Sequence, residues 1–466
     1  MGSIGRMGRL LWTTNSLQQT LLSVMSDLRE GSVPKGWQIV RRSIASSSHT
    51  RKIGSSHSLS GGQVIQDSKK SPETPLLKQL IARIKFSGPL TVHDYMKEVL
   101  INPLAGYYSA GKDMFGSHGD YITSPEICQM FGELVGVWIY NEWCKLGSPK
   151  PLQLIELGPG RGTFMQDILK VLNQLNVSGK ELSVQLVEVS EELSQKQEEK
   201  LCGKVIFDKD ACEEELYYKK SITTTGSPIF WHRHLSTIPK SFSVFLANEF
   251  FDVLPVHKIR RTENGWREVL IDIDDGDGPH HLRYVLSRAA TPAAKVFIQP
   301  EETRDEVEVS PEAAVLCGEM ANRIEEDGGI SLIIDYGYDG KVSNTFRGFR
   351  NHVLHDPLCE PGTADLTVDV DFGYLKQQVQ EKLVTYGPVT QSSFLINMGI
   401  EFRLANLLKH CTCEEQKSLI SGYKMLTEPQ QMGERFKFLA FYPAVVRDFL
   451  IRYPPAGFYR NLEGHV

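Results

Sequence analysis

Apolar positions along the chain follow two periods, one typical of buried strands and one typical of helices. Continuous apolar runs predict strands buried on both faces at Leu152–Leu157, Val184–Val189, Ser243–Ala247 and Ser331–Ile334. Between them, apolar residues recur at helical spacing in Phe164–Leu175, Ser190–Leu201 and Pro311–Glu326. This alternation predicts an α/β fold with a mostly parallel sheet that is wrapped by helices on both faces.

The segments around this alternation predict further units. Residues 73–150 carry helical patterns at Pro75–Phe86, after Thr91 and at Pro125–Cys144, which predict a helical N-terminal cap with a long loop at 102–121. Residues 256–310 interrupt the alternation as a β-rich insertion. We therefore divide the α/β domain into 151–255 and 311–445, followed by a tail at 446–466. Within the second part, 363–372 alternates as a strand does and Arg435–Tyr442 predicts a closing strand.

Chemistry concentrates where the first predicted strand ends. The strand carries one acid, Glu156, and breaks on Gly158, Gly160 and Gly162 before a helix begins. Glycines let the backbone turn tightly and lie against a ligand, and the helix that follows presents free N–H groups there. The dinucleotide fingerprint requires its third glycine where this chain has Thr163, so the spacing disfavours a nicotinamide cofactor. A tight strand-to-helix turn without a ligand is the plain alternative.

Two further strand ends carry polar residues. Glu188 lies near the end of the second strand, where it could accept hydrogen bonds from ribose hydroxyls or favour the N-terminus of the next helix. The third strand runs into a corner with an amide, two acids and two aromatics, namely Asn248, Glu249, Phe250, Phe251 and Asp252. Such a corner is typical of a binding site, although an acid there can also cap a turn.

Composition excludes several classes of function. The net charge of −6 provides no broad basic surface for nucleic acid, and no apolar run is long enough to span a membrane. The eight cysteines lack the paired spacing of a zinc site and indicate free thiols in a reducing compartment. His352, His355 and Cys359 lack a fourth ligand, so we predict no metal.

The N-terminal residues 1–66 differ from the rest of the chain. They are rich in arginine and serine, and their only acids are Asp27 and Glu30. This composition predicts disorder and is typical of a mitochondrial transit peptide, whereas an ordinary disordered tail is the alternative.

Several longer motifs carry a resemblance to a known family. ELGPGRGT resembles motif I of the class I S-adenosyl-L-methionine (SAM)-dependent methyltransferases. Together with GDYITSPEICQMFGELVG, VQLVEVS, LANEFFDVLPVHK, LIIDYGYDG, TFRGFR, PGTADLTVDVDF and MGERFKFLA, it resembles the MidA family of these enzymes, and in particular its mitochondrial protein arginine methyltransferases. The match extends from about Pro75 to Ala440.

The resemblance implies a mitochondrial matrix enzyme with a class I, Rossmann-like fold and SAM as its cofactor. Its partner would be a core iron–sulfur-arm subunit of respiratory complex I, on which it dimethylates an arginine symmetrically during assembly. A second copy of the chain, in a homodimer, is a further candidate partner. Within this reading, SAM binds at Glu156, Gly158, Gly160, Gly162 and Glu188.

For the substrate side, Glu249, with Asp252 as second choice, would bind the guanidinium. Asn248, Phe250 and Phe251 would shape its pocket. The rival hypotheses are a catalytically silent assembly chaperone, an NAD-dependent oxidoreductase and a methyltransferase for small molecules.

Overall fold

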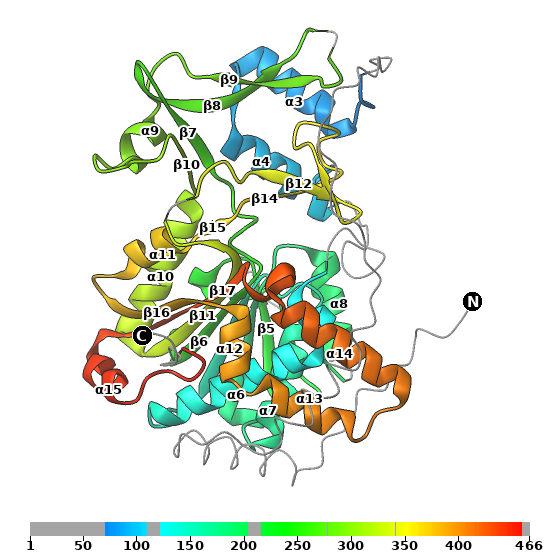
Figure 1. Cartoon of the computed structure of the whole chain (residues 1–466), viewed down its shortest axis with the longest axis vertical. Coiled ribbons are helices and arrows are strands. Elements are labelled where there is room, and N and C mark those ends of the chain that lie inside the picture. The colour runs from blue at the N-terminus through cyan, green and yellow to red at the C-terminus, as the bar shows by residue number, and fades with distance from the viewer. Residues whose placement is uncertain (1–69, 110–121, 204–215, 277, 341, 459–466) are drawn as a thin grey trace.

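The computed structural model describes residues 70–109, 122–203, 216–276, 278–340 and 342–458. The predicted transit region at 1–66 lies outside these residues. Figure 1 shows a large sheet wrapped by helices in the lower half of the molecule and a smaller, β-rich unit above it.

Five parallel strands form the centre of the large sheet. In spatial order they are β11 (Gly329–Tyr338), β6 (Ser243–Asn248), β2 (Leu152–Leu157), β3 (Leu182–Val187) and β5 (Pro228–His232). The edges are antiparallel: β17 (Phe436–Pro443) lies between β11 and β16 (Leu383–Thr390), and β4 (Lys219–Ile222) pairs with β5. All six residues of β2 are buried, as expected for a central strand covered on both faces. The predicted sheet and its closing strand are confirmed.

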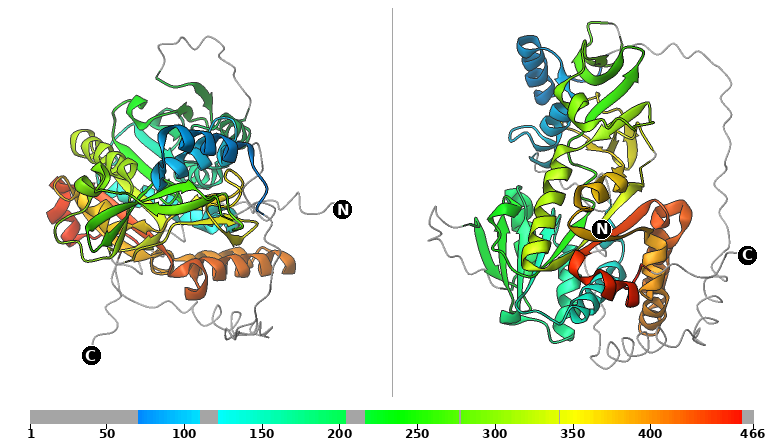
Figure 2. Two further views of the ribbon diagram at one scale, coloured as in Figure 1. Left: turned by 90° about the horizontal axis from the view of Figure 1, so that it is seen from above. Right: turned by 90° about the vertical axis from the view of Figure 1, so that its left-hand side faces the viewer.

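Helices cover both faces of this sheet. One face packs against α6 (Gln129–Lys145), α7 (Thr163–Gln174), α12 (Gln391–Asn397), α13 (Ile400–Leu408) and α14 (Cys413–Thr427). The other face packs against α10 (Pro311–Asp327) and α11 (Phe372–Val379). Successive side chains of β2 point to opposite sides, so that Leu154 joins the first core and Ile155 the second. Figure 2 shows the same layers from two further directions.

The helix predicted at Pro125–Cys144 is in fact two helices. α5 (Ser124–Ile127) ends at Cys128, whose backbone is extended, with φ −157° and ψ 132°, and α6 begins at Gln129. The bend allows α6 to lie along α7 while the N-terminus of α5 turns toward the end of β6, where the backbone N–H of Ser124 donates to Glu249. This long-range contact gives no signal in the helical spacing.

The β-rich insertion forms a sheet of its own. Its strands are β7 (His257–Thr262), β8 (Gly265–Ile273), β9 (Leu282–Leu286) and β10 (Glu306–Val309), with the short helix α9 (Pro292–Phe297) between β9 and β10. The order is β1-β8-β7-β10, with β9 also paired to β8. The first strand of that order, β1 (Leu90–Thr91), comes from the N-terminal segment.

The N-terminal segment at 73–150 is divided between the two units. α3 (Pro75–Ser87) and α4 (Val92–Ile101) share a core with the insertion, in which Leu77 and Tyr95 pack with Ile271 and Leu282. α6 instead belongs to the core of the large sheet. The helices predicted as one cap therefore lie in two places, because their apolar faces fit different partners.

The loop after β11 forms a small sheet above the large one. It contains β12 (Arg347–Arg350), β13 (Val353–His355) and β14 (Asp365–Thr367), while β15 (Val370–Asp371) pairs with the end of β11. The strand predicted at 363–372 is therefore interrupted. Asp371 caps α11 by accepting from the N–H of Tyr374, at 3.1 Å, so the last residues of the predicted strand serve a helix end.

The same loop contains His355 and Cys359. The Nε2 of His355 lies 3.0 Å from the backbone oxygen of Cys359, and the described residues contain no group of side chains suited to hold a metal ion. In the described part of the chain, no helix combines the length and apolarity that crossing a membrane needs. The C-terminal tail adds α15 (Arg447–Arg452).

Close packing of α6 on α7 depends on a glycine. A Cβ built on Gly132 would lie 2.8 Å from the Cβ of Asp167, whereas one built on Gly318 of α10 meets nothing within 4 Å. We predict that Gly132→Ala destabilises the protein by about 1–3 kcal/mol through overpacking. Gly318→Ala serves as the matched control and should stabilise it by about 0.5–1 kcal/mol through helix propensity. Urea unfolding measures both, and equal effects of the two changes would contradict this account.

Candidate active site

The glycine turn joins β2 to α7 in a left-handed backbone conformation. Gly158, Gly160 and Gly162 have φ values of 62°, 52° and 76°, and Gly162 is the N-cap of α7. A Cβ on Gly158 would lie 2.6 Å from Cδ2 of Phe250, and one on Gly162 would lie 3.2 Å from Cδ1 of Leu201. Glycine is therefore required both by the turn and by the neighbours that pack on it.

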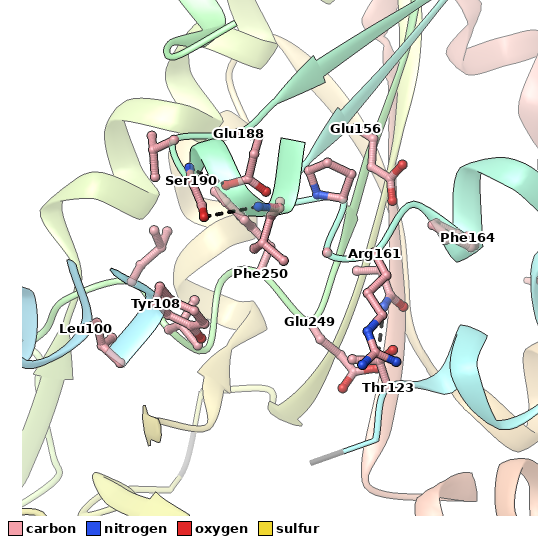
Figure 3. A pocket seen from close by; sticks show the side chains of 18 of the residues that line it. Leu100, Tyr108, Thr123, Glu156, Arg161, Phe164, Glu188, Ser190, Glu249 and Phe250 are labelled. Atoms are coloured by element: carbon pink, nitrogen blue, oxygen red, sulfur yellow. Dashed lines mark hydrogen bonds between the residues drawn. The ribbon is translucent and has the colours of Figure 1, made fainter. Parts of the chain in front are cut away.

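A cavity of about 280 Å³ lies above this turn, between the large sheet and the smaller unit (Figure 3). The turn and strand ends contribute Glu156, Gly158, Gly160, Glu188, Ser190, Asn248, Glu249 and Phe250. The opposite walls come from α4, the segment after it and α5, with Lys97, Leu100, Ile101, Tyr108, Thr123, Pro125 and Glu126. The cavity thus lies at the carboxyl ends of the parallel strands, where α/β folds bind their ligands.

Three of the residues that the sequence singles out do not line this cavity. Gly162 instead packs against α8 (Glu191–Leu201). Phe251 is 3% exposed and lies in the core beneath the sheet. Asp252 is buried, and its Oδ2 accepts from the hydroxyl of Tyr336 at 2.5 Å. The corner therefore presents Phe250 to the cavity and turns the two residues after it, Phe251 and Asp252, away from it.

Strand alternation explains why the polar side chains come together. On β2, β3 and β6, one face carries Leu154, Leu186 and Leu246, which all join the same core. Two residues further along each strand, the same face carries Glu156, Glu188 and Asn248. Because these strands are parallel neighbours, the three polar side chains meet at one edge of the sheet.

Glu156 is 2% exposed, and its Oε2 has no hydrogen-bond partner among the described residues. Burial, with a smaller contribution from the charge of Glu188, raises the pKa of Glu156 to about 8. A buried carboxylate without a partner is costly, so this site favours a ligand that brings a positive charge or N–H donors. Glu156 therefore fits the cationic methionine end of SAM.

Both carboxylate oxygens of Glu188 accept hydrogen bonds from the start and the middle of α8. Its Oε1 accepts from the N–H of Ser190, the N-cap of α8, at 2.8 Å, and its Oε2 accepts from Nε2 of Gln197 at 3.0 Å. Burial raises the pKa of Glu188, and these hydrogen bonds oppose that shift. Gln197 also donates to the backbone oxygen of Gly160, at 2.8 Å, so the helix, the acid and the glycine turn form one unit.

Glu249 occupies the most unusual backbone position of the site. Its φ is 51°, which costs a non-glycine residue about 1 kcal/mol or more, and its N–H donates to the backbone oxygen of Ile334 at 2.8 Å. Its Oε1 accepts from the N–H of Ser124 at 2.8 Å. Burial is the largest cause that raises the pKa of Glu249 to about 8, and the charge of Asp252 adds to it.

Sequence reasoning missed the residue that holds this corner. Asp335, at the end of β11, is fully buried, and its Oδ2 accepts from the backbone N–H groups of Phe250 and Phe251, at 3.1 and 3.0 Å. The available signal was an acid at the end of the apolar run Ser331–Ile334, the same pattern that marks Glu156 on β2. Tyr108 was also missed; it lies in the long loop predicted at 102–121, of which 110–121 lie outside the described residues.

The fold and the site together define a class of protein. The order β5-β3-β2-β6-β11-β17-β16, in which only β17 runs against its neighbours, is that of the class I SAM-dependent methyltransferases. Its glycine turn and Glu188 line the cavity at the carboxyl ends of the strands, where α/β folds bind their ligands.

Comparisons with known proteins agree with this class. A family model described as "Putative S-adenosyl-L-methionine-dependent methyltransferase" matches residues 134–389. Protein arginine methyltransferase NDUFAF7, mitochondrial, of Homo sapiens is 50% identical over 378 residues, which cover 80% of this chain and 85% of that protein. Its homolog in Drosophila melanogaster is 49% identical over 391 residues, covering 82% and 88%. The chain belongs to this family of SAM-dependent methyltransferases, and the resemblance to the MidA family is confirmed.

A solved structure supports the fold. A protein of Burkholderia thailandensis, described as a "likely methyl transferase" and solved with S-adenosyl-homocysteine bound, has a TM-score of 0.63 and 22% identity. The similarity covers 80% of this chain and 95% of that one. At 22% identity, this comparison supports the fold and no more than the fold.

The cofactor of the family is SAM, which supplies an electrophilic methyl group on a sulfonium centre. In this chain, the residues that would hold it are Gly158 and Gly160 of the turn with Glu156 and Glu188. The glycines let a ligand lie close to the backbone. Glu156 provides a buried carboxylate that favours a positive partner, and Glu188 provides a second carboxylate at the end of the next strand.

We predict that Gly158→Ala weakens SAM binding at least about tenfold, because the new Cβ would push the ring of Phe250 into the cavity. Gly179→Ala is the matched control: its φ of 66° imposes the same left-handed cost, yet its Cβ meets nothing within 4 Å. Titration calorimetry measures the two dissociation constants. Equal SAM affinity in both variants would show that the contact of the new Cβ with Phe250 does not weaken SAM binding.

Glu156 also gives the cofactor-free protein a characteristic pH dependence. Its pKa is raised from 4.5 to about 8, so the folded protein keeps a proton that the unfolded chain has lost. The free energy of unfolding should therefore fall as pH rises from about 5 to about 8, and Glu156→Gln should flatten this slope by about 1 kcal/mol per pH unit. Urea unfolding across this range measures the slope, with the exposed Glu263→Gln as control. A slope unchanged by Glu156→Gln would contradict the burial of this acid.

Proposed function

We propose that this protein is a mitochondrial protein arginine methyltransferase. In detail, we propose that it dimethylates symmetrically an arginine of a core iron–sulfur-arm subunit of complex I, in the matrix, and that complex I assembly needs this step. The names of its relatives support the arginine substrate and the mitochondrial location. The Arg-rich and Ser-rich composition of residues 1–66 supports the location as well.

The observation that carries the proposal is the carboxylate of Glu249 in the cavity beside the glycine turn. An arginine side chain stays protonated at physiological pH and presents N–H donors in a planar fork. A carboxylate is its natural partner, and burial strengthens their interaction. Glu249 can therefore bind and orient a guanidinium next to the residues that would hold SAM.

Glu249 also suits the proton balance of the reaction. When a guanidinium nitrogen gains a methyl group, it must lose one of its protons. The pKa of Glu249, raised to about 8 by burial, lets its carboxylate take up a proton near neutral pH. Asn248 and Phe250 line the same cavity and would shape the space around the guanidinium. In this proposal Asp252 and Phe251 support the corner and do not touch the substrate.

We predict that Glu249→Gln lowers arginine methylation about 10²-fold or more while SAM still binds, because the neutral amide cannot hold or deprotonate the guanidinium. The assay incubates the protein with labelled SAM and mitochondrial extract that lacks this enzyme, and mass spectrometry identifies the labelled protein and side chain. Glu263→Gln, at an exposed position of the β7–β8 turn, is the control. SAM affinity is measured in parallel by calorimetry.

Different outcomes separate this proposal from its rivals. Label on a side chain other than arginine, or an unchanged yield with Glu249→Gln, would contradict the substrate class or the role of Glu249. A variant that cannot bind SAM but restores complex I in cells lacking the enzyme would favour a silent assembly chaperone. Symmetric dimethylarginine, as opposed to the asymmetric or monomethylated form, is identified from the fragmentation pattern.

A further inference from the structure

The corner that carries Glu249 is fixed by the end of β11. Its backbone donates to the oxygen of Ile334 and to the carboxylate of Asp335, which together hold Glu249, Phe250 and Phe251. A left-handed residue in a loop needs such support, because its neighbours must offset the backbone strain. These contacts fix the main chain, but they leave the side chain of Asp252, at the far end of the corner, to another partner.

That partner is Tyr336. Its hydroxyl donates to Oδ2 of Asp252 at 2.5 Å, and the N–H of Val368 donates to the backbone oxygen of Asp252 at 2.9 Å. Oδ1 of Asp252 is buried and has no hydrogen-bond partner among the described residues. Tyr336 is therefore the side chain that satisfies the carboxylate of Asp252.

The ring of Tyr336 is itself contacted by two arginines. The guanidinium carbon of Arg347 lies 5.3 Å from the ring centroid and that of Arg435 lies 5.6 Å from it. Both arginines pair with Asp369, and Phe436 packs edge-on against the ring with centroids 5.4 Å apart. Cation–π contacts and an aromatic neighbour thus fix the direction of the hydroxyl.

We propose that Tyr336 is a positioning residue for the reaction: its hydroxyl, aimed by Arg347 and Arg435, fixes the Asp252 carboxylate and with it the corner that presents Glu249 to the substrate. This inference rests on the proposed function, since it takes Glu249 as the group that binds the guanidinium. It assigns Asp252 a role through Glu249, not through contact with the substrate.

The electrostatics of the corner give this arrangement a measurable consequence. Burial raises the pKa of Asp252 to about 6, whereas the Tyr336 hydroxyl and the charge of Arg347 lower it and so favour the ionised form. An ionised Asp252 in turn raises the pKa of Glu249. Tyr336 therefore sustains the proton affinity of Glu249 from a distance.

Other ionisable groups also face Glu249. On β11, Asp335 lies close enough that the charge of Glu249 raises its pKa. Among the cavity-lining residues, Arg161 belongs to the glycine turn, Lys97 to α4 and Glu126 to α5. Asp335 also accepts from the backbone N–H of Asp252 at 3.4 Å, whereas the side chain of Asp252 accepts from the hydroxyl of Tyr336. A change at Tyr336 therefore reaches Glu249 through the charge of Asp252.

The test measures the titration of Glu249 directly. The protein is labelled with carbon-13 at its glutamate carboxyl groups, and the Glu249 signal is assigned by its absence in Glu249→Gln. We expect Tyr336→Phe and Asp252→Asn each to lower the pKa of Glu249, because both reduce the negative charge beside it. Tyr338→Phe, two residues further on β11, is the matched control and should leave that pKa unchanged.

The double variant Tyr336→Phe/Asp252→Asn should match Asp252→Asn alone, because the hydroxyl acts through the carboxylate. The proposal would be overturned if Tyr336→Phe left the pKa of Glu249 unchanged. It would also be overturned if adding Tyr336→Phe to Asp252→Asn shifted that pKa further. Since Asp252→Asn conserves the side-chain shape, it keeps the comparison available even if Tyr336→Phe folds poorly.

Activity provides the second readout. Tyr336→Phe should lower kcat for arginine methylation several-fold and move the acid limb of the kcat/KM profile to lower pH, while the dissociation constant for SAM is unchanged. Loss of SAM affinity in parallel with activity would point to a merely structural role and overturn the proposal. The carboxyl titration requires no methylation. A wild-type protein that methylates no arginine would contradict the proposed function, while the titration would still show whether Tyr336 acts on the pKa of Glu249 through Asp252.

Discussion

The buried carboxyl group of Asp335 is the contact on which the acidic side of the pocket depends. Burial, together with the charges of Asp252 and Glu249, raises its pKa well above the usual range of an aspartate. Its position beneath the corner nevertheless provides an acceptor for backbone N–H groups that would otherwise be buried without partners. Together with the backbone oxygen of Ile334, this acceptor offsets the strain of the left-handed conformation of Glu249. The geometry of the corner is therefore set by a strand that is distant in sequence.

The pocket gathers more negative than positive groups in a largely apolar enclosure. Glu156, Glu188 and Glu249 line it, and burial raises the pKa of each. In such surroundings a carboxylate keeps its charge only when a cation or several N–H donors approach it. A sulfonium cofactor with an ammonium group and a guanidinium substrate both meet this need. Among the described residues, the buried Oε2 of Glu156 and Oδ1 of Asn248 have no hydrogen-bond donor, so they too would accept from a ligand.

Two hydrophobic cores meet at the pocket and determine its width. The large sheet provides the floor, while α4 of the smaller unit provides a wall with Leu100 and Ile101. α8 joins both cores, because Leu193 at its start packs with the smaller unit and Leu201 at its end packs with the large sheet. The helix α4, which packs against the insertion, thus places a wall over the strand ends of the large sheet.

The sequence by itself determined the alternation of strands and helices, the glycine turn and the strand ends that carry Glu156, Glu188 and Glu249, because period and local chemistry are written in neighbouring residues. Only the tertiary structure decided which corner residues face the cavity, why the helix predicted at Pro125–Cys144 bends, and where the N-terminal helices pack. It also decided that Asp335 and Tyr336 support the corner. Each of these depends on contacts between residues far apart in the chain, for which local periodicity carries no signal.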